Sequence, residues 1–196
     1  GEVWALDKAI ETIGLRANLV GIYCADGEER VNEYSPFENL SNEEVRKNLN
    51  PKGILTGKFI VDELKPTVEE GKKISSRLIG GSSMGGVMSL YMGSKYPEVF
   101  DKVLAMSTHF LIDPFGMGEI LSKFDPKNKQ KVYLDTGTKE FDDEVIQKSY
   151  VNLSQMAYGV LKDRLDIKYV IDKGAIHNEI YWQKRLPEAL RYLYNL

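Results

Sequence analysis

The chain contains very few of the residues that build disulfides and zinc clusters. Only one of its 196 residues is cysteine, and only two are histidine. Cys24 has no second cysteine for an internal disulfide, and its place in an apolar run is typical of a buried thiol. One cysteine and two histidines are too few for a zinc cluster of the usual spacing. The sequence therefore predicts no internal disulfide and no metal site.

The chain also lacks an excess of positive charge and any long apolar run. Its 26 Lys and Arg and 29 Asp and Glu give a formal net charge of −3, so we expect no nucleic-acid partner. No apolar run reaches membrane-spanning length and no basic-then-apolar signal pattern is present, so we expect no membrane span and a cytoplasmic location. The "TGK" at residues 56–58 lacks the upstream glycine of a phosphate-binding loop, and we predict no cofactor.

Short apolar runs alternate with helical patterns along the whole chain. With 42% hydrophobic residues, 196 residues suit one domain with a sizeable core. The runs are rich in Val, Ile and Leu and mostly lack polar alternation, as in strands buried on both faces. This order predicts a single α/β domain with a mainly parallel sheet and helices on both faces. The predicted strands lie at residues 17–24, 77–80, 102–107, 131–135 and 167–171.

A glycine-rich stretch, "GGSSMGG", follows the second predicted strand and opens a helical pattern. Only Ser83 fits a G-x-S-x-G frame, because a frame centred on Ser82 puts Met84 where the second glycine belongs. A nucleophile on a sharp strand-to-helix turn has a strained backbone, and the residues two before and two after it crowd each other. We predict Ser83 as the nucleophile, against the alternative of a glycine-rich helix start with solvent-facing serines.

The helix that would start after Ser83 supplies a second feature of such a site. The free N–H groups and the dipole of a helix start favour negative charge. The N–H of Met84 would then point at an oxyanion that develops on the substrate. We therefore predict Met84 as an oxyanion donor.

A nucleophilic serine needs a base, and the chain offers two histidines. In serine hydrolases of the α/β type the order along the chain is serine, acid, histidine, with the histidine after the last strand. His177 has that place, whereas His109 follows the strand predicted at residues 102–107. We predict His177 as the base and His109 as a residue that contacts substrate. For each, the alternative is a hydrogen-bonded structural histidine.

Several carboxylates follow the strand predicted at residues 131–135. Asp142 and Asp143 are equally suited to the first turn of the next helix, where its dipole stabilises them. Asp135 closes the strand and is suited to cap the following turn. Glu140 lies on the loop itself and is free to reach an imidazole. The pattern favours Glu140 as the acid without excluding the others.

Three stretches together resemble the putative-esterase family of α/β-hydrolases: "GGSSMGGVMSLYMGSKYPEVF", "YLDTGTKE" and "IHNEIYWQKRLPEAL". "RVNEYSPF", which begins at Arg30, resembles the family's R-x-x-E-Y-x-P segment. The resemblance covers nearly the whole chain and places the acid on Glu140 and the histidine on His177. The family includes S-formylglutathione hydrolases, feruloyl and acetyl-xylan esterases, and mycolyltransferases. The ending is most similar to its siderophore-esterase branch.

The resemblance implies a serine carboxylic-ester hydrolase that acts through an acyl-enzyme on a small or medium ester. A siderophore lactone and a phenolic or acetyl ester are the substrates it suggests. An acyltransferase would share the same residues, whereas a non-catalytic binding domain would normally have lost one of them. Arg30 and Trp182 join His109 as predicted substrate contacts. For Arg30 the alternative is an ion pair with Glu33.

The resemblance also implies that part of the sheet is missing from residues 1–196. In the family a helix like "VWALDKAIETIG" (residues 3–14) follows the third strand, and "ANLVGIYC" (residues 17–24) is the fourth. The third strand lies between the fourth and the strand before the nucleophile, and its loop supplies the second oxyanion N–H. We expect an N-terminally incomplete domain whose sheet is completed by an upstream segment or a second chain. The alternative is a rearranged sheet in which residues 17–24 pair directly with residues 77–80.

Overall fold

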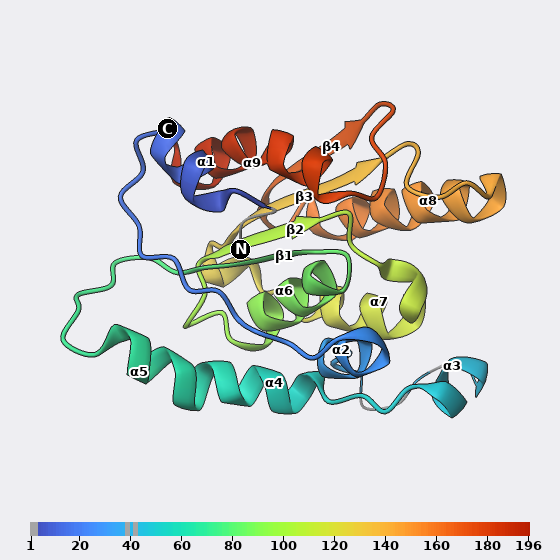
Figure 1. The fold of residues 1–196 in the computed structure, drawn as a ribbon, viewed down its shortest axis with the longest axis horizontal. Coiled ribbons are helices and arrows are strands. Elements are labelled where there is room, and N and C mark those ends of the chain that lie inside the picture. The colour runs from blue at the N-terminus through green and yellow to red at the C-terminus, as the bar shows by residue number, and fades with distance from the viewer. Residues whose placement is uncertain (1–3, 38–39, 41–42) are drawn as a thin grey trace.

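Four parallel strands form the sheet of the computed structural model, which describes residues 4–37, 40 and 43–196 (Figure 1). The connections between them contain helices, as parallel strands require. Four of the five predicted strands are confirmed, each within a few residues of its expected position. In order across the sheet they are β1 (Leu78–Ser82), β2 (Lys102–Met106), β3 (Lys131–Gly137) and β4 (Asp166–Asp172).

Helices cover both faces of this sheet, which confirms the predicted α/β architecture (Figure 1). On one face lie α1 (Leu6–Thr12) and α9 (Glu179–Tyr194), and on the other α6 (Met84–Lys95) and α8 (Glu144–Leu161), with α7 (Pro114–Ser122) packed against α6 and α8. Among the described residues no helix is both long and apolar enough to cross a bilayer. The other helical segments are α2 (Gly27–Glu33), α3 (Glu43–Asn48), α4 (Gly53–Phe59), a π-helical turn (Ile60–Leu64), α5 (Lys65–Glu69), and 3₁₀ turns at Phe110–Ile112 and Pro126–Asn128.

Consecutive residues of β2 face opposite sides of the sheet. Val103 and Ala105 belong to the core cluster that includes α6 residues, and Leu104 and Met106 to the cluster that includes α9 residues. All four are at most 1% exposed. Burial on both faces explains why the sequence of this strand shows no polar alternation.

Residues 17–24, predicted as a strand, lie outside the sheet, so this prediction is wrong (Figure 1, the blue segment between α1 and α2). The segment is extended but largely exposed, with Leu19 52% and Tyr23 100% accessible. Apolar composition alone does not place a segment in a sheet, because its N–H and C=O groups also need a strand to pair with.

The predicted alternative, in which residues 17–24 pair directly with residues 77–80, is wrong as well. β1 pairs with β2 only and is therefore an edge strand of the described sheet. Completion of the sheet by another segment or a second chain stays a prediction. Val3, which belongs to the helix predicted at residues 3–14, lies outside the described residues.

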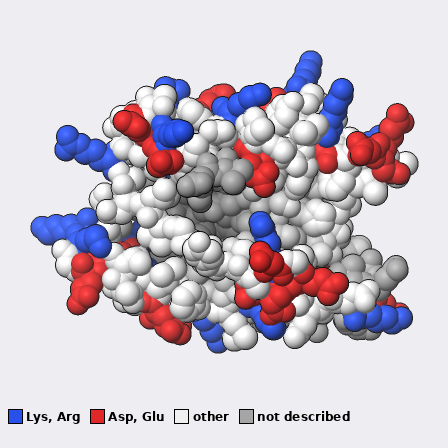
Figure 2. All heavy atoms as spheres, in the orientation of Figure 1, with Lys and Arg blue, Asp and Glu red and all other residues white. Residues whose placement is uncertain are grey.

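Charged side chains of both signs are spread over the surface. On the face of the described residues drawn in Figure 2, basic and acidic groups are interspersed around the rim and form no patch of a single sign. This distribution agrees with the small formal net charge of −3.

Candidate active site

Ser83 lies at the junction of β1 and α6, directly after Ser82 and before Met84. Its backbone has φ 55° and ψ −120°, a region that a residue with a side chain rarely adopts and that costs free energy. Hydrogen bonds hold it there: its N–H donates to Met106 O at 2.9 Å, and its carbonyl accepts from His109 N–H at 3.2 Å. This is the backbone expected of a nucleophile on a strand-to-helix turn.

Two of the glycines around Ser83, Gly81 and Gly86, leave no room for a side chain, whereas a Cβ on Gly85 would have no atom within 4 Å. A Cβ on Gly81 would lie 2.6 Å from the backbone of Gly85, closer than such atoms can come. A Cβ on Gly86 would lie 2.5 Å from Thr108 Oγ1. Ser82, by contrast, is a buried strand residue that is only 7% exposed. The geometry therefore fits the frame centred on Ser83.

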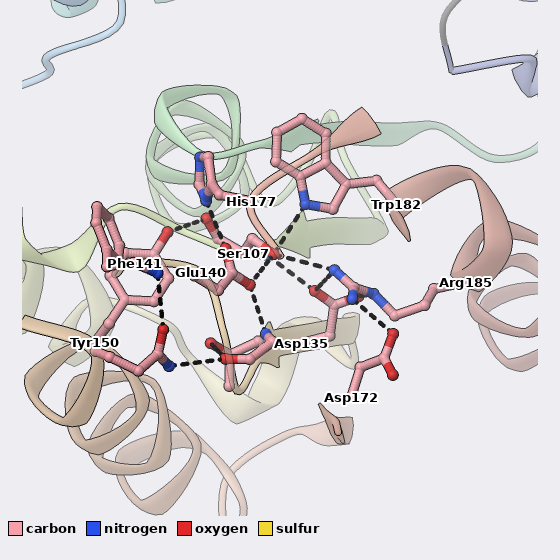
Figure 3. A network of polar contacts seen from close by, with 12 residues as sticks. Ser107, Asp135, Glu140, Phe141, Tyr150, Asp172, His177, Trp182 and Arg185 are labelled. Atoms are coloured by element: carbon pink, nitrogen blue, oxygen red, sulfur yellow. Dashed lines mark hydrogen bonds and ion pairs between the residues drawn. The ribbon is translucent and has the colours of Figure 1, made fainter. Parts of the chain in front are cut away.

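The structure brings Glu140 and His177 together from the loops after β3 and β4 (Figure 3). Nδ1 of His177 lies 2.5 Å from Oε2 of Glu140. The Glu140 side chain is completely buried, while that of His177 is 26% exposed. Two of the other candidate acids are engaged elsewhere: Asp143 caps α8, and Asp135 binds Arg185.

Hydrogen bonds keep the buried Glu140 ionised. Burial alone would raise its pKa, but hydrogen bonds from His177, Ser107 and the Gly137 N–H outweigh burial, so the pKa lies below its ordinary value. A charged carboxylate on Nδ1 of His177 fixes the tautomer that leaves Nε2 free to accept a proton.

Ser83 and His177 make no direct hydrogen bond among the described residues of this structure. Neighbouring residues lie between them. The His109 N–H donates to the Ser83 carbonyl, and the centroid of the His109 ring lies 6.0 Å from that of Tyr150. The Tyr150 centroid in turn lies 6.1 Å from that of His177. Hydrogen bonds between a nucleophile and its base are often long before substrate binds.

The N–H of Met84 is available at the start of α6. Residues at the first turn of a helix have no partner within the helix for their N–H groups. Across the described part of the chain, no hydrogen bond uses the Met84 N–H, whereas the Gly86 N–H already bonds to Ser83 O at 3.0 Å. The Met84 N–H thus lies where an oxyanion donor is expected, next to Ser83 and at the positive end of the helix dipole.

An aromatic cluster surrounds the imidazole of His177. The ring of Phe141 lies 5.9 Å from His177 and 4.9 Å from Tyr150, and the ring of His109 lies 6.4 Å from Phe141. Burial, with a smaller effect of His177, lowers the pKa of His109 to about 4, so this imidazole is neutral near pH 7. His109 therefore lies beside the site, and its contact with substrate stays a prediction.

The other two predicted substrate contacts have different surroundings. Arg30 is exposed on α2, where its guanidinium lies 5.8 Å from the Tyr34 ring, and no described contact joins it to Ser83 or His177. The alternative ion pair with Glu33 is also not formed among the described residues. Trp182 is buried behind His177, with ring centroids 5.1 Å apart. Substrate binding by either residue stays a prediction.

Two residues of this region were not predicted from the sequence. Ser107 follows β2, and Arg185 lies within α9, and both are buried. The Ser107 hydroxyl donates to Glu140, and the Arg185 guanidinium donates to the Ser107 hydroxyl. Arg185 follows Lys184, and two adjacent cations are typical of an exposed helix surface. The only sequence signal for Ser107 was its position at the end of an apolar strand. Within the described residues, no group of three or more His, Cys, Asp or Glu could hold a metal ion.

The chain is similar to several known proteins. It is 25% identical over 185 residues to an uncharacterized protein, YbbA, of Bacillus subtilis (strain 168), an alignment that covers 90% of this chain and 72% of the relative. Among solved structures, the BES protein from Bacillus cereus has a TM-score of 0.72 at 20% identity, over 98% of this chain and 76% of that one. Siderophore hydrolase EstA from Aspergillus nidulans has a TM-score of 0.70 at 17% identity, over 86% and 67%.

These structural likenesses show the fold, which is the α/β-hydrolase fold. The family model described as "Putative esterase" matches residues 15–193. That match confirms the resemblance seen in the motifs, and the chain belongs to the putative-esterase family.

Proposed function

We propose that the protein is a serine esterase with Ser83 as nucleophile, His177 as general base and Glu140 as acid. The observation that carries the proposal is the pairing of His177 with the buried, ionised Glu140, in a chain whose Ser83 has a positive φ at the start of α6. Membership of an esterase family agrees with it. In a serine hydrolase the acid orients the base, and the base takes the proton of the serine.

The reaction would proceed in two halves. Ser83 Oγ attacks the ester carbonyl, its proton passes to Nε2 of His177, and the Met84 N–H donates to the oxyanion. The bond to the alcohol then breaks, the alcohol leaves with the proton from His177, and an acyl-enzyme remains on Ser83. Water attacks the acyl group with His177 again as base, which releases the acid and restores the serine. Glu140 stabilises the imidazolium in both halves.

The aromatic cluster supports a small or medium ester as substrate. Neutral His109 and the ring of Phe141, both partly exposed, offer apolar surface beside His177 rather than a charged binding group. A siderophore lactone or a phenolic or acetyl ester fits this environment, and one similar structure is titled a siderophore hydrolase. His109 is the substrate contact that the geometry favours most.

Labelling with a fluorophosphonate tests the nucleophile directly. Mass spectrometry of the digested protein should find the adduct on the peptide that contains Ser83, and Ser83→Ala should abolish it while Ser82→Ala keeps it. An adduct on another residue, or none in an active preparation, would refute the assignment. Product analysis with an added alcohol separates hydrolysis from acyl transfer, since a transferase would form the new ester instead of the free acid.

A further inference from the structure

Ser107 lies behind Glu140 and is bonded at each of its polar atoms (Figure 3). It is completely buried and has a φ of 43°, in the left-handed region that favours glycine. Its N–H donates to Asp135 Oδ1 at 2.9 Å, and its carbonyl accepts from the Tyr150 hydroxyl. A strained residue held by this many hydrogen bonds indicates a constraint beyond packing.

The contacts of Ser107 Oγ allow only one position for its hydrogen atom. Trp182 Nε1 lies 2.9 Å away and Arg185 Nη2 lies 3.0 Å away, and both groups can only donate. A hydroxyl has two lone pairs and one hydrogen, so these donors occupy the lone pairs. The hydrogen must therefore face the remaining partner, Glu140 Oε1, at 2.5 Å.

Arg185 connects the Ser107 hydroxyl to β3 and β4 through hydrogen bonds. Its guanidinium donates to both oxygens of Asp135 in β3, at 2.8 and 3.2 Å, and to Asp172 at the end of β4, at 2.9 Å. Burial would lower the pKa of Arg185, but the two carboxylates raise it above its ordinary value, and the side chain is cationic. A fixed cation on the oxygen of Ser107 makes its hydroxyl a stronger donor to Glu140.

We propose that Ser107 is a positioning residue for Glu140, and that Trp182 and Arg185 act on the reaction through Ser107. The proposal rests on the serine-esterase function proposed above. Ser107 and the Gly137 N–H hold Oε1 of Glu140, each at 2.5 Å, which leaves Oε2 to His177. The carboxylate cannot rotate without breaking hydrogen bonds in a site closed to water, so Ser107 sets the orientation of an imidazole that it does not touch.

Two substitutions at Ser107 separate positioning from stability. Ser107→Ala and Ser107→Gly both remove the hydroxyl, but only glycine adopts the positive φ without strain. We expect kcat to fall about 10- to 100-fold in both, as for loss of one hydrogen bond to a charged group, with much less change in KM. Their melting temperatures should differ. A kcat that followed thermal stability from variant to variant would contradict the proposal.

The dependence of kcat on pH distinguishes positioning from a purely structural role, because a structural role would leave this dependence unchanged. The Ser107 hydroxyl is one of the groups that lower the pKa of Glu140, so its removal raises that pKa. A more basic Glu140 stabilises the imidazolium form of the base more strongly, so the acid limb of kcat against pH should move to higher pH in both Ser107 variants. Ser154→Ala, at a buried serine of α8 outside this group, is the matched control and should leave kcat and the profile unchanged. Full kcat and an unmoved acid limb in Ser107→Ala would overturn the proposal.

A double-mutant cycle tests whether the two donors act through Ser107. Trp182→Phe keeps an aromatic ring but loses the N–H, and Arg185→Lys keeps the charge but loses the planar fork. We expect each to lower kcat about 3- to 10-fold in the wild-type background and to have little further effect in Ser107→Ala. Equal fold-changes in kcat in the wild-type and Ser107→Ala backgrounds would show that Trp182 and Arg185 act independently of Ser107, and would refute their proposed role. If Arg185→Lys does not fold, Trp182→Phe completes the cycle alone.

Failure of the esterase function would look different from failure of the positioning role. If the wild-type protein is neither active on esters nor labelled at Ser83, the proposed esterase function is refuted, and the positioning role of Ser107 is refuted with it. If the wild type is active and labelled while Ser107→Ala matches it, only the positioning role falls.

Discussion

The nucleophile and the acid of the proposed site are held in place by different means. Ser83 is fixed by backbone geometry: a positive φ, hydrogen bonds of its own N–H and C=O, and the contact between Gly81 and Gly85. Glu140 is fixed by its side chain, which is completely buried and bonded at both oxygens. Substitutions near the nucleophile should therefore act mainly on folding, whereas those around the acid should act mainly on chemistry.

The largest loss of activity is expected when the proposed nucleophile or base itself is replaced, rather than a residue that holds it in place. Ser83→Ala should lower kcat on short p-nitrophenyl esters by roughly a million-fold, the scale of serine-protease triads, and His177→Ala should cost as much. Ser82→Ala is the matched control, because that serine is a buried strand residue. Equal losses in the two serine variants would show that the frame is wrong.

Glu140→Gln should have the next largest effect. Glutamine keeps the shape of the side chain but loses the charge that stabilises the imidazolium, and comparable changes in triads cost about ten-thousand-fold in kcat. Asp143→Ala is the control, since Asp143 caps α8 and its loss should cost about 1 kcal/mol of stability without lowering kcat. Near-normal activity of Glu140→Gln would point to Asp135, Asp142 or a Ser–His pair without an acid.

Gly81→Ala tests the part of the site that depends on the backbone. Its Cβ would meet the backbone of Gly85 at 2.6 Å, so the turn must move, and we expect a loss of about 1–3 kcal/mol in the free energy of unfolding. Gly85→Ala is the matched change in the same turn, because a Cβ there has no atom within 4 Å. Urea unfolding of both variants measures the difference. Similar stabilities would mean that close approach at Gly81 does not hold the turn.

The effect expected to be smallest at neutral pH concerns His109, because it develops only as the pH falls. Folding lowers the pKa of His109 from 6.5 to about 4, first through burial and then through His177. Between these pH values the unfolded chain binds more protons than the folded one, so the free energy of unfolding falls as pH decreases from about 6.5 to 4. His109→Gln should make this decrease shallower in urea unfolding at several pH values. An unchanged slope would show that His109 is not the group that is kept neutral.

Much of the fold and of the site could be predicted because the signals are local. The four strands of the sheet are short apolar runs, and the unbroken apolar composition of β2 after Lys102 agrees with its burial on both faces. The glycine at position 81 reflects a contact within a single turn, with the backbone of Gly85. Glu140 was favoured by its place on a loop after β3, and the structure shows it bonded to His177.

What could not be predicted depends on contacts between distant segments. Residues 17–24 have the composition of a strand, but no described strand pairs with them. Arg185 stands among charged neighbours, and nothing in "QKRLPEAL" reveals that its guanidinium is buried against β3 and β4. Ser107 is linked to Trp182, 75 positions away along the chain, by one hydrogen bond. Periodicity and motif spacing carry no information on such pairs.

Pro187 lies inside α9, after the residues of that helix that reach the site. Trp182 and Arg185 precede the proline and bond to Ser107, whereas Ala189, Leu190 and Leu193 follow it and pack with Trp182 in the core cluster beside α1. A proline has no N–H to continue the helical ladder, so one backbone hydrogen bond is missing within α9. Transient opening of the turns before the proline would release Ser107 and the loop of His177 together while the sheet stays intact. The working lifetime of the enzyme on heating would then follow amide exchange in residues 179–186 rather than global melting.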